Sequence, residues 1–275
     1  MQTTIQLRFY GDLPIFLHPS QRKKIFTHTV KGRPSVKDTI EALGVPHTEV
    51  DVIIANGCSV DFSYQPKEGD RISVYPEAAI IKGRRFSIEN KGTDSLLKKR
   101  KKRGLVHSIN KRIIHLKPRG PFSAQFILDA HLGKLAKWLR LLGFDTLYKR
   151  DYTDREIVQT AVKKNRIILT RDRGLLKNKV IRYGVWVRAT DPSLQVKEII
   201  CKFNLFNKIR PFRLCLECNG RIKRVAKSKI LNRIPPQTQI YYNSFYLCEL
   251  CQKIYWKGSH FAGLQKVIKK VRKRG

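Results

Sequence analysis

The spacing of hydrophobic residues changes along the chain, and each change predicts a different kind of structure. Residues 4–10 alternate between apolar and polar side chains, which predicts a strand with one buried face. Three more strands are expected at 24–30, 52–57 and 70–76, and a helix at 36–43. Gly44 stands where a left-handed residue would end that helix. Residues 1–81 are therefore expected to form a small α+β domain of strands around one helix.

From residue 126 onward, short apolar runs alternate with helical periodicity. Residues 126–128 are apolar and lead into Asp129, and leucines at helical spacing follow over 132–142. Later elements are expected as strands at 144–148 and 166–170 and as a helix at 154–163. Repeated strand-helix units predict an α/β domain with a parallel sheet, which we assign to residues 123–210. Asp172 also follows a strand, so it should converge with Asp129 beyond the carboxyl ends of the strands.

Charge divides the chain into two unequal parts. Residues 1–80 hold nine basic and nine acidic residues, whereas residues 81–275 hold 48 basic and 12 acidic residues and carry the whole formal charge of +36. Such an excess is tolerated best where a polyanion neutralises it, so RNA or DNA is the favoured partner. An acidic membrane surface is the alternative, but the basic residues are spread over folded segments and mixed with aromatic residues.

Residues 82–122 lack a periodic pattern and are predominantly polar and basic, with an unbroken basic run at 98–103. We interpret them as a linker that can also contact phosphates. The chain shows no apolar run of membrane-spanning length and no secretory signal pattern, which predicts a soluble, cytoplasmic protein.

Two Cys-x-x-Cys pairs lie in the basic part of the chain. Cys215 with Cys218, and Cys248 with Cys251, have the spacing that lets two thiolates converge on one zinc ion. Strands expected at 221–225, 240–242 and 245–247 complete a zinc ribbon over residues 211–275. A pair of disulfides or reduced, buried thiols is the alternative, and the absence of a secretory signal disfavours it. Four thiolates leave no open coordination position, so this zinc is expected to be structural. Cys58 and Cys201 stand alone and are interpreted as core residues.

Carboxylates are the candidates for catalysis. Hydrolysis of a phosphodiester needs Mg²⁺ or Mn²⁺, and hard cations prefer carboxylate oxygens. Asp129, Asp154 and Asp172 form the expected catalytic metal cluster. Each has an alternative role at a helix start, and for Asp154 the sequence Thr153-x-x-Glu156 also predicts a capping box.

Basic residues near these acids are candidates for RNA binding. One group recurs at helical spacing opposite the leucines, a second flanks Asp172, and a third alternates with aromatic residues such as Tyr241, Tyr242 and Tyr246 in the ribbon. The expected RNA-binding residues are Lys134, Lys137, Arg140, Arg171, Arg173, Arg221, Lys223 and Arg224.

Two stretches of the sequence resemble known families. Residues 129–148 with their Leu-x-x-Leu-Gly helix, the segment Thr-Asp-Arg-Glu-Ile at 153–157, Leu-Thr-Arg-Asp at 169–172 and both cysteine pairs resemble, in that order, the "Mut-seven C-terminal" ribonucleases. That family of PIN-like nucleases carries a zinc ribbon, so the resemblance implies a metal-dependent ribonuclease. Residues 54–57 and 68–76 look like ubiquitin-like sulfur carriers of the β-grasp fold. Carriers end in a free Gly-Gly that is missing here, which favours an interaction module.

One departure from the PIN-like pattern bears on activity. Related sequences often place a second acid directly after the first, whereas Ala130 and His131 follow Asp129. The alternative to an enzyme is therefore a non-catalytic RNA- or ribosome-binding protein that retains the fold.

Overall fold

The computed structural model describes residues 2–76, 113–116 and 124–272, which fall into two compact units, Met1–Gly120 and Pro121–Gly275. Most of the linker predicted at 82–122, with its basic run at 98–103, lies outside the described residues. The regions predicted at 123–210 and 211–275 fall within one compact unit. Among the described residues, no helix combines the length and the apolar character needed to cross a bilayer.

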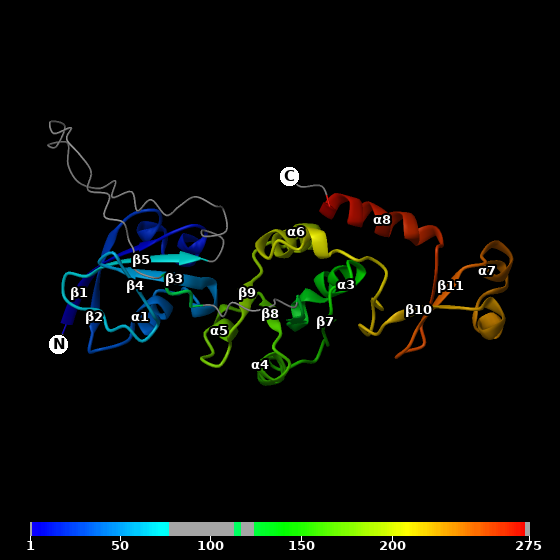
Figure 1. Ribbon diagram of the computed structural model, residues 1–275, viewed down its shortest axis with the longest axis horizontal. Helices are drawn as coiled ribbons and strands as arrows, with labels where there is room; N and C mark the ends of the chain where they lie inside the picture. Colours follow the sequence, from blue (N-terminus) through cyan, green and yellow to red (C-terminus); the bar gives the residue numbers. More distant parts are fainter. Residues whose placement is uncertain (1, 77–112, 117–123, 273–275) are drawn as a thin grey trace, which may run out of the picture. The chain divides into compact units, whose positions relative to one another are not determined.

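The N-terminal unit is a five-stranded sheet with helix α1, drawn in blue and cyan in Figure 1. The strand order is β2-β1-β5-β3-β4, with β1 parallel to β5 and the other neighbours antiparallel. This is the expected β-grasp arrangement. The elements are β1 (Gln2–Phe9), β2 (Phe26–Lys31), α1 (Val36–Ala42), β3 (Val50–Ala55), β4 (Cys58–Val60) and β5 (Arg71–Pro76).

Local sequence signals account for the limits of α1. Ser35 and Asp38 form a reciprocal capping box at its start, which satisfies backbone N–H groups that the helix leaves unpaired. Gly44 follows its end with φ of 96°, in the left-handed region that glycine adopts without strain.

Residues 113–116 pack against the same sheet. The backbone N–H of Leu116 donates to the carbonyl of Asp51, and that of Ile114 donates to the hydroxyl of Ser59. The ring of His115 lies 2.8 Å from the Asp51 carboxylate. The N-terminal unit therefore uses residues well beyond the predicted boundary at 81.

The second unit contains a four-stranded sheet of order β7-β6-β8-β9 in which all neighbours are parallel, as the repeated strand-helix pattern predicts. Its elements are β6 (Phe126–Leu128), α3 (Gly133–Leu141), β7 (Thr146–Leu147), α4 (Asp154–Lys163), β8 (Ile167–Thr170), α5 (Arg173–Leu176), β9 (Gly184–Trp186) and α6 (Pro192–Lys202).

Helices cover both faces of this sheet (Figure 1). On one face, the leucines of α3 pack with the apolar side of α6, and on the other face α4 and α5 pack on Ile127 and Ile168. Gly143 follows α3 with φ of 91°, in the left-handed region. A Cβ at this position would lie 2.1 Å from the carbonyl oxygen of Arg210, so only glycine allows the later chain to pass this close.

The zinc-ribbon region forms an antiparallel sheet of order β10-β11-β12. Its elements are β10 (Ile222–Val225), α7 (Pro236–Tyr241), β11 (Phe245–Cys248), β12 (Ile254–Trp256) and α8 (Ser259–Arg272). The strand predicted at 240–242 is wrong, because proline at the first helical position favours a helix there. Helix α8 returns to the α/β core, where it buries Ile268 and Val271.

Candidate functional site

The acids predicted from the strand ends lie at one edge of the parallel sheet. Asp129 follows β6 and Asp172 lies just beyond β8, and these strands are paired neighbours. The hydroxyl of Thr170 connects them, because it donates to Asp129 Oδ2 and accepts a 2.8 Å bond from the backbone N–H of Asp172. Asp129 Oδ2 also accepts from the backbone N–H of Arg171 at 2.9 Å. The carboxylate of Asp129 therefore fixes the turn that presents Asp172.

Asp172 and Asp154 line one open cleft with a volume of about 690 Å³. Asp154 lies in the first turn of α4, and Asp172 caps α5, where its Oδ1 accepts from the N–H of Gly174 at 2.6 Å. The same cleft is lined by two cations and two amides that sequence reasoning missed, namely Arg155, Lys177, Gln159 and Asn178. Their only sequence signal is that they follow the two acids on α4 and α5.

The expected cluster of three acids is not formed at the distances of a single metal site. Among the described residues, the four cysteines form a group whose ligand atoms all lie within 4.8 Å of one another. Asp129, Asp154 and Asp172 do not form such a group within these ranges. Asp129 does not line the cleft and is 7% exposed. Mg²⁺ is commonly held by one or two carboxylates together with water and substrate phosphates, so the pair Asp154 and Asp172 fits such an ion.

The capping box predicted at the start of α4 is confirmed. Thr153 and Glu156 form the capping box of α4, and the hydrogen bonds from Thr153 lower the pKa of Glu156. Asp154 therefore stands beside a complete cap and is left exposed toward the cleft. His131 is exposed, and its backbone N–H donates to Asp129.

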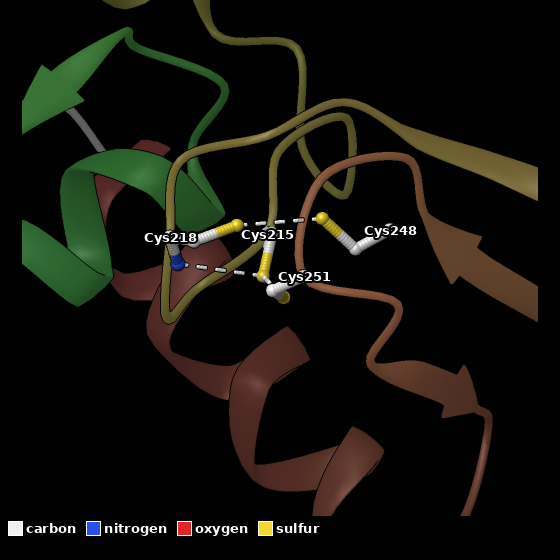
Figure 2. A group of neighbouring side chains, drawn as sticks. All are labelled: Cys215, Cys218, Cys248 and Cys251. Carbon is white, nitrogen blue, oxygen red and sulfur yellow. Dashed lines mark hydrogen bonds between the residues drawn. The ribbon is translucent and has the colours of Figure 1, made fainter.

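The four cysteines of the two pairs converge, with their ligand atoms within 4.8 Å of one another. Figure 2 shows the two cysteine loops facing each other. Cys218 Sγ lies 3.4 Å from Cys248 Sγ, and Cys215 Sγ lies 3.6 Å from Cys251 Sγ. A tetrahedral zinc ion with Zn–S bonds of 2.3 Å separates its sulfurs by about 3.8 Å, so the group fits zinc. Among the other cysteines, Cys201 is exposed on α6, which contradicts its expected place in the core.

Backbone N–H groups approach two of the cysteine sulfurs. The N–H groups of Cys218 and Gly220 point to sulfurs at 3.5 and 3.4 Å. A Cβ on Gly220 would lie 2.8 Å from Cys248 Sγ, so this position needs glycine. Burial raises the pKa of the Cys215 thiol, but hydrogen bonds from Tyr255 and from backbone N–H groups outweigh it and lower the pKa to about 6.

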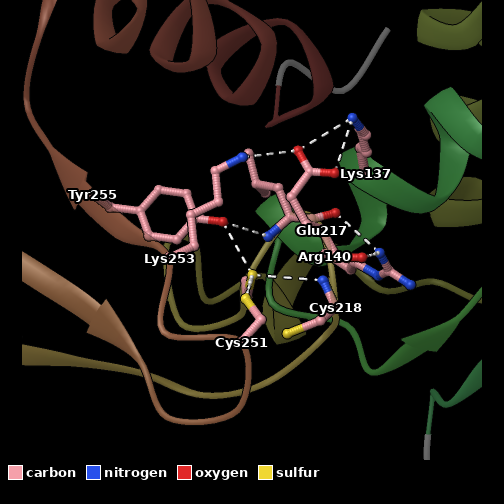
Figure 3. A network of polar contacts seen from close by, with 9 residues as sticks. Lys137, Arg140, Glu217, Cys218, Cys251, Lys253 and Tyr255 are labelled. Carbon is pink, nitrogen blue, oxygen red and sulfur yellow. Dashed lines mark hydrogen bonds and ion pairs between the residues drawn. The ribbon is translucent and has the colours of Figure 1, made fainter. Parts of the chain in front are cut away.

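Arg140 is buried and cannot contact RNA, which corrects the prediction made from its helical spacing. Its guanidinium donates to the carbonyls of Thr146, Leu216 and Glu217 at 2.9, 2.9 and 2.7 Å, and the side chain is 2% exposed. Burial lowers its pKa. Lys137, one turn earlier on α3, lies 3.2 Å from the Glu217 carboxylate, which Lys253 contacts too (Figure 3). Arg140 and Lys137 on this face of α3 therefore hold the loop of Cys215 and Cys218. Lys134, at the start of the same helix, is exposed.

Asp145 connects the α/β sheet to the ribbon. Its carboxylate receives two hydrogen bonds from Arg166 at 2.9 and 2.8 Å and one from Asn219 at 2.6 Å. Burial raises the pKa of Asp145, but these hydrogen bonds outweigh it and hold the pKa below its ordinary value. Nothing local in the sequence indicates these partners, because they lie 21 and 74 residues away.

The remaining predicted RNA-binding residues fall into two places. Near the carboxylates, Arg171 donates to the carbonyl of Ala189 at 3.3 Å, and the guanidinium carbon of Arg173 lies 3.9 Å from the ring centre of Trp186. In the ribbon, three cations line a cleft of about 650 Å³, namely Arg221, Lys223 and the previously unrecognised Arg213. Lys223 also pairs with Glu249, and Arg224 is exposed on β10.

Comparisons with known families agree with this geometry. Residues 124–268 match the family model described as the Mut7-C RNAse domain, and residues 2–82 match the model described as Mut7-C ubiquitin. The first match spans the α/β sheet, the carboxylate edge and the four cysteines. No curated protein and no solved structure matches the chain.

Proposed function

The chain belongs to the Mut7-C RNAse family, and from this premise we propose that it is a metal-dependent ribonuclease whose reacting centre is the cleft of Asp154 and Asp172. The observation that supports this most strongly is the composition of the cleft. Two carboxylates stand beside Arg155 and Lys177, so one surface offers ligands for a cation and partners for a phosphate.

In this proposal, Asp154 and Asp172 bind Mg²⁺ or Mn²⁺ in its hydrated form. When bound, such a cation neutralises charge on the phosphate and lowers the pKa of a water molecule. Arg155 and Lys177 hold the phosphate oxygens of the strand. Asp129 is a positioning residue, since it fixes Thr170 and thereby the turn that carries Asp172.

The other parts of the chain assist binding. Zinc at the four cysteines is proposed to hold the ribbon in shape, because four thiolates leave no position for substrate. RNA is proposed to contact Lys134, Arg221, Lys223 and Arg224, together with Arg171 and Arg173 near the carboxylates. The Mut7-C ubiquitin domain is proposed to bind a protein partner.

The test compares cleavage by wild-type protein with cleavage by Asp154→Asn and Asp172→Asn, using end-labelled RNA in Mg²⁺ or Mn²⁺. Asparagine retains helix capping, so Asp172→Asn should fold while losing metal affinity. Asp191→Asn is the matched control, because Asp191 caps α6 and does not line the cleft. We expect both cleft variants to lose at least about tenfold in rate, because mutating even the outer-shell partners of metal ligands costs about 10- to 100-fold, with the control unchanged.

A non-catalytic RNA-binding protein is the second candidate. Two observations favour it: Ala130 occupies the position after Asp129, and the three acids do not meet at metal-ligand distance within the described residues. RNA binding by wild-type protein without metal-dependent cleavage, at a salt concentration where complexes form, would replace the ribonuclease proposal by this one.

A further inference from the structure

A second cleft, lined almost wholly by rings and aliphatic side chains, lies between the ribbon, α3 and α8. It has a volume of about 260 Å³ and shares no lining residue with the carboxylate cleft. This volume is below the range of drug-sized ligand sites, so it suits a single ring system. Its most informative lining residues are Phe212, Tyr246, Tyr255, Trp256, Lys257 and Phe261. We call it the aromatic pocket.

One wall of the aromatic pocket is held in place by unusual backbone geometry. Phe212 has φ of 61°, which is uncommon for a bulky residue and is found where the surroundings fix the conformation. Its N–H donates to the carbonyl of Leu141 at 3.1 Å, and its ring stacks on Phe261 of α8 with centres 4.9 Å apart. Phe212 is nevertheless 38% exposed. The ring is therefore held in an uncommon backbone conformation and still faces solvent.

The opposite wall is a cross-strand row on the ribbon sheet. Arg224 pairs with Tyr246 on β11, and Tyr246 pairs with Tyr255 on β12, so these three side chains stand on one face of the sheet. The hydroxyl of Tyr255 contacts Cys215 Sγ at 3.0 Å and accepts from the N–H of Leu216 (Figure 3), which fixes this ring relative to the cysteine group.

Positive charge borders the aromatic pocket. Lys257 Nζ lies 5.6 Å from the ring centre of Phe261, and Arg224 stands exposed at the end of the aromatic row. The occupant must therefore present a flat apolar group attached to negative charge. A nucleotide whose base is unstacked has this combination, and base stacking on aromatic side chains is how proteins hold single strands. In a duplex the bases are stacked on one another and cannot enter.

We propose that the aromatic pocket binds one unpaired base of a single-stranded RNA, while Arg224 and Lys257 neutralise the adjoining phosphates. This inference rests on the proposed function and adds to it a preference for RNA with unpaired nucleotides.

The test measures binding of zinc-loaded, full-length protein to a fluorescent 12-nucleotide single-stranded RNA and to the same strand annealed as a blunt duplex. No Mg²⁺ or Mn²⁺ is added. Tyr246→Ala is expected to weaken single-strand binding by about 5- to 150-fold, the value of one stacked base, and duplex binding by less than about twofold. Tyr246→Phe keeps the ring and should bind like wild type. Ile240→Ala is the control, since Ile240 is 73% exposed in the ribbon, lies outside the pocket and has no ring on which a base could stack.

Several outcomes would overturn the inference. Tyr246→Ala could leave single-strand binding unchanged, or weaken both RNAs equally. Sedimentation could also show that wild type is a dimer and that Tyr246→Ala is a monomer. If the RNA preference were unchanged, the pocket would then be assigned to contact with a second copy of the chain. If wild type binds neither RNA, both this inference and the proposed action on RNA are refuted. Cleavage is measured in a separate assay. If wild type binds RNA but does not cleave it, the ribonuclease proposal fails, and the effect of Tyr246→Ala on single-strand binding still tests the pocket.

Discussion

Replacing Arg140 by methionine distinguishes a structural role from an RNA-binding role. Methionine keeps an unbranched apolar stem but removes the guanidinium and its three hydrogen bonds to carbonyls. Hydrogen bonds from charged donors contribute about 1.5–3 kcal/mol each, and the carbonyl of Thr146 would be left buried. The carbonyls of Leu216 and Glu217 are partly buried and regain water, so we expect a total loss of about 3–5 kcal/mol in the free energy of unfolding.

Lys137→Met provides the matched control. Lys137 lies one turn earlier on the same helix and contacts the same residue, Glu217, but the two side chains are 51% and 44% exposed. Exposed ion pairs contribute at most about 1 kcal/mol, so this variant should unfold close to wild type.

The assay is urea unfolding of zinc-loaded protein followed by tryptophan fluorescence. All three tryptophans, Trp138, Trp186 and Trp256, lie in the unit Pro121–Gly275, so the signal reports on this unit and not on the β-grasp unit. Our reasoning would be refuted if Arg140→Met unfolded within about 1 kcal/mol of wild type, or if it lost RNA affinity at unchanged stability.

Two further predictions concern the connections to the ribbon. Asp145→Asn should lower stability at pH 7 by about 2 kcal/mol, because Arg166 loses its paired charge at a partly exposed site. The folded-state pKa of Asp145 is depressed, so its contribution is present above its unfolded pKa of about 3.9 and is lost as the pH falls through the lower folded value. The difference between the urea midpoints of the two proteins should therefore shrink as the pH falls below about 3.9. A constant difference from pH 7 to pH 3 would contradict this assignment. Metal analysis should find one zinc ion per chain, with Cys218→Ser reducing zinc content and Cys201→Ser, at an exposed cysteine outside the group, leaving it unchanged.

Features set by short-range spacing could be predicted from the sequence. The two-residue spacing within each Cys-x-x-Cys pair already sets the geometry of its loop. The four-cysteine group therefore required only that the two pairs come together. Repeated strand-helix units predicted the parallel sheet, and the rule that ligands bind beyond the strand ends brought Asp129 and Asp172 to one edge. The same rule does not set distances between side chains, which is why the expected three-acid cluster was not obtained.

Features set by long-range packing could not be predicted. Periodicity correctly separated Arg140 from the leucines of α3, but the ribbon that covers this face lies 76 residues further along the chain. The segment 240–242 has strand-forming residues, and the prolines preceding it were overlooked as a helix start. Arg155 and Lys177 went unnoticed because surface cations on helices usually face solvent and carry no local pattern.

The return of α8 to the α/β core has a consequence for synthesis of the chain. Ile268 and Val271 belong to the same core as Phe126, so a chain emerging from the ribosome cannot close that core until residues 268–271 have been made. The cysteine ligands emerge earlier, and the ribbon can take up zinc while one side of the core is still open. Short truncations or frameshifts near residue 268 should therefore leave a metal-loaded ribbon attached to an incompletely packed α/β domain.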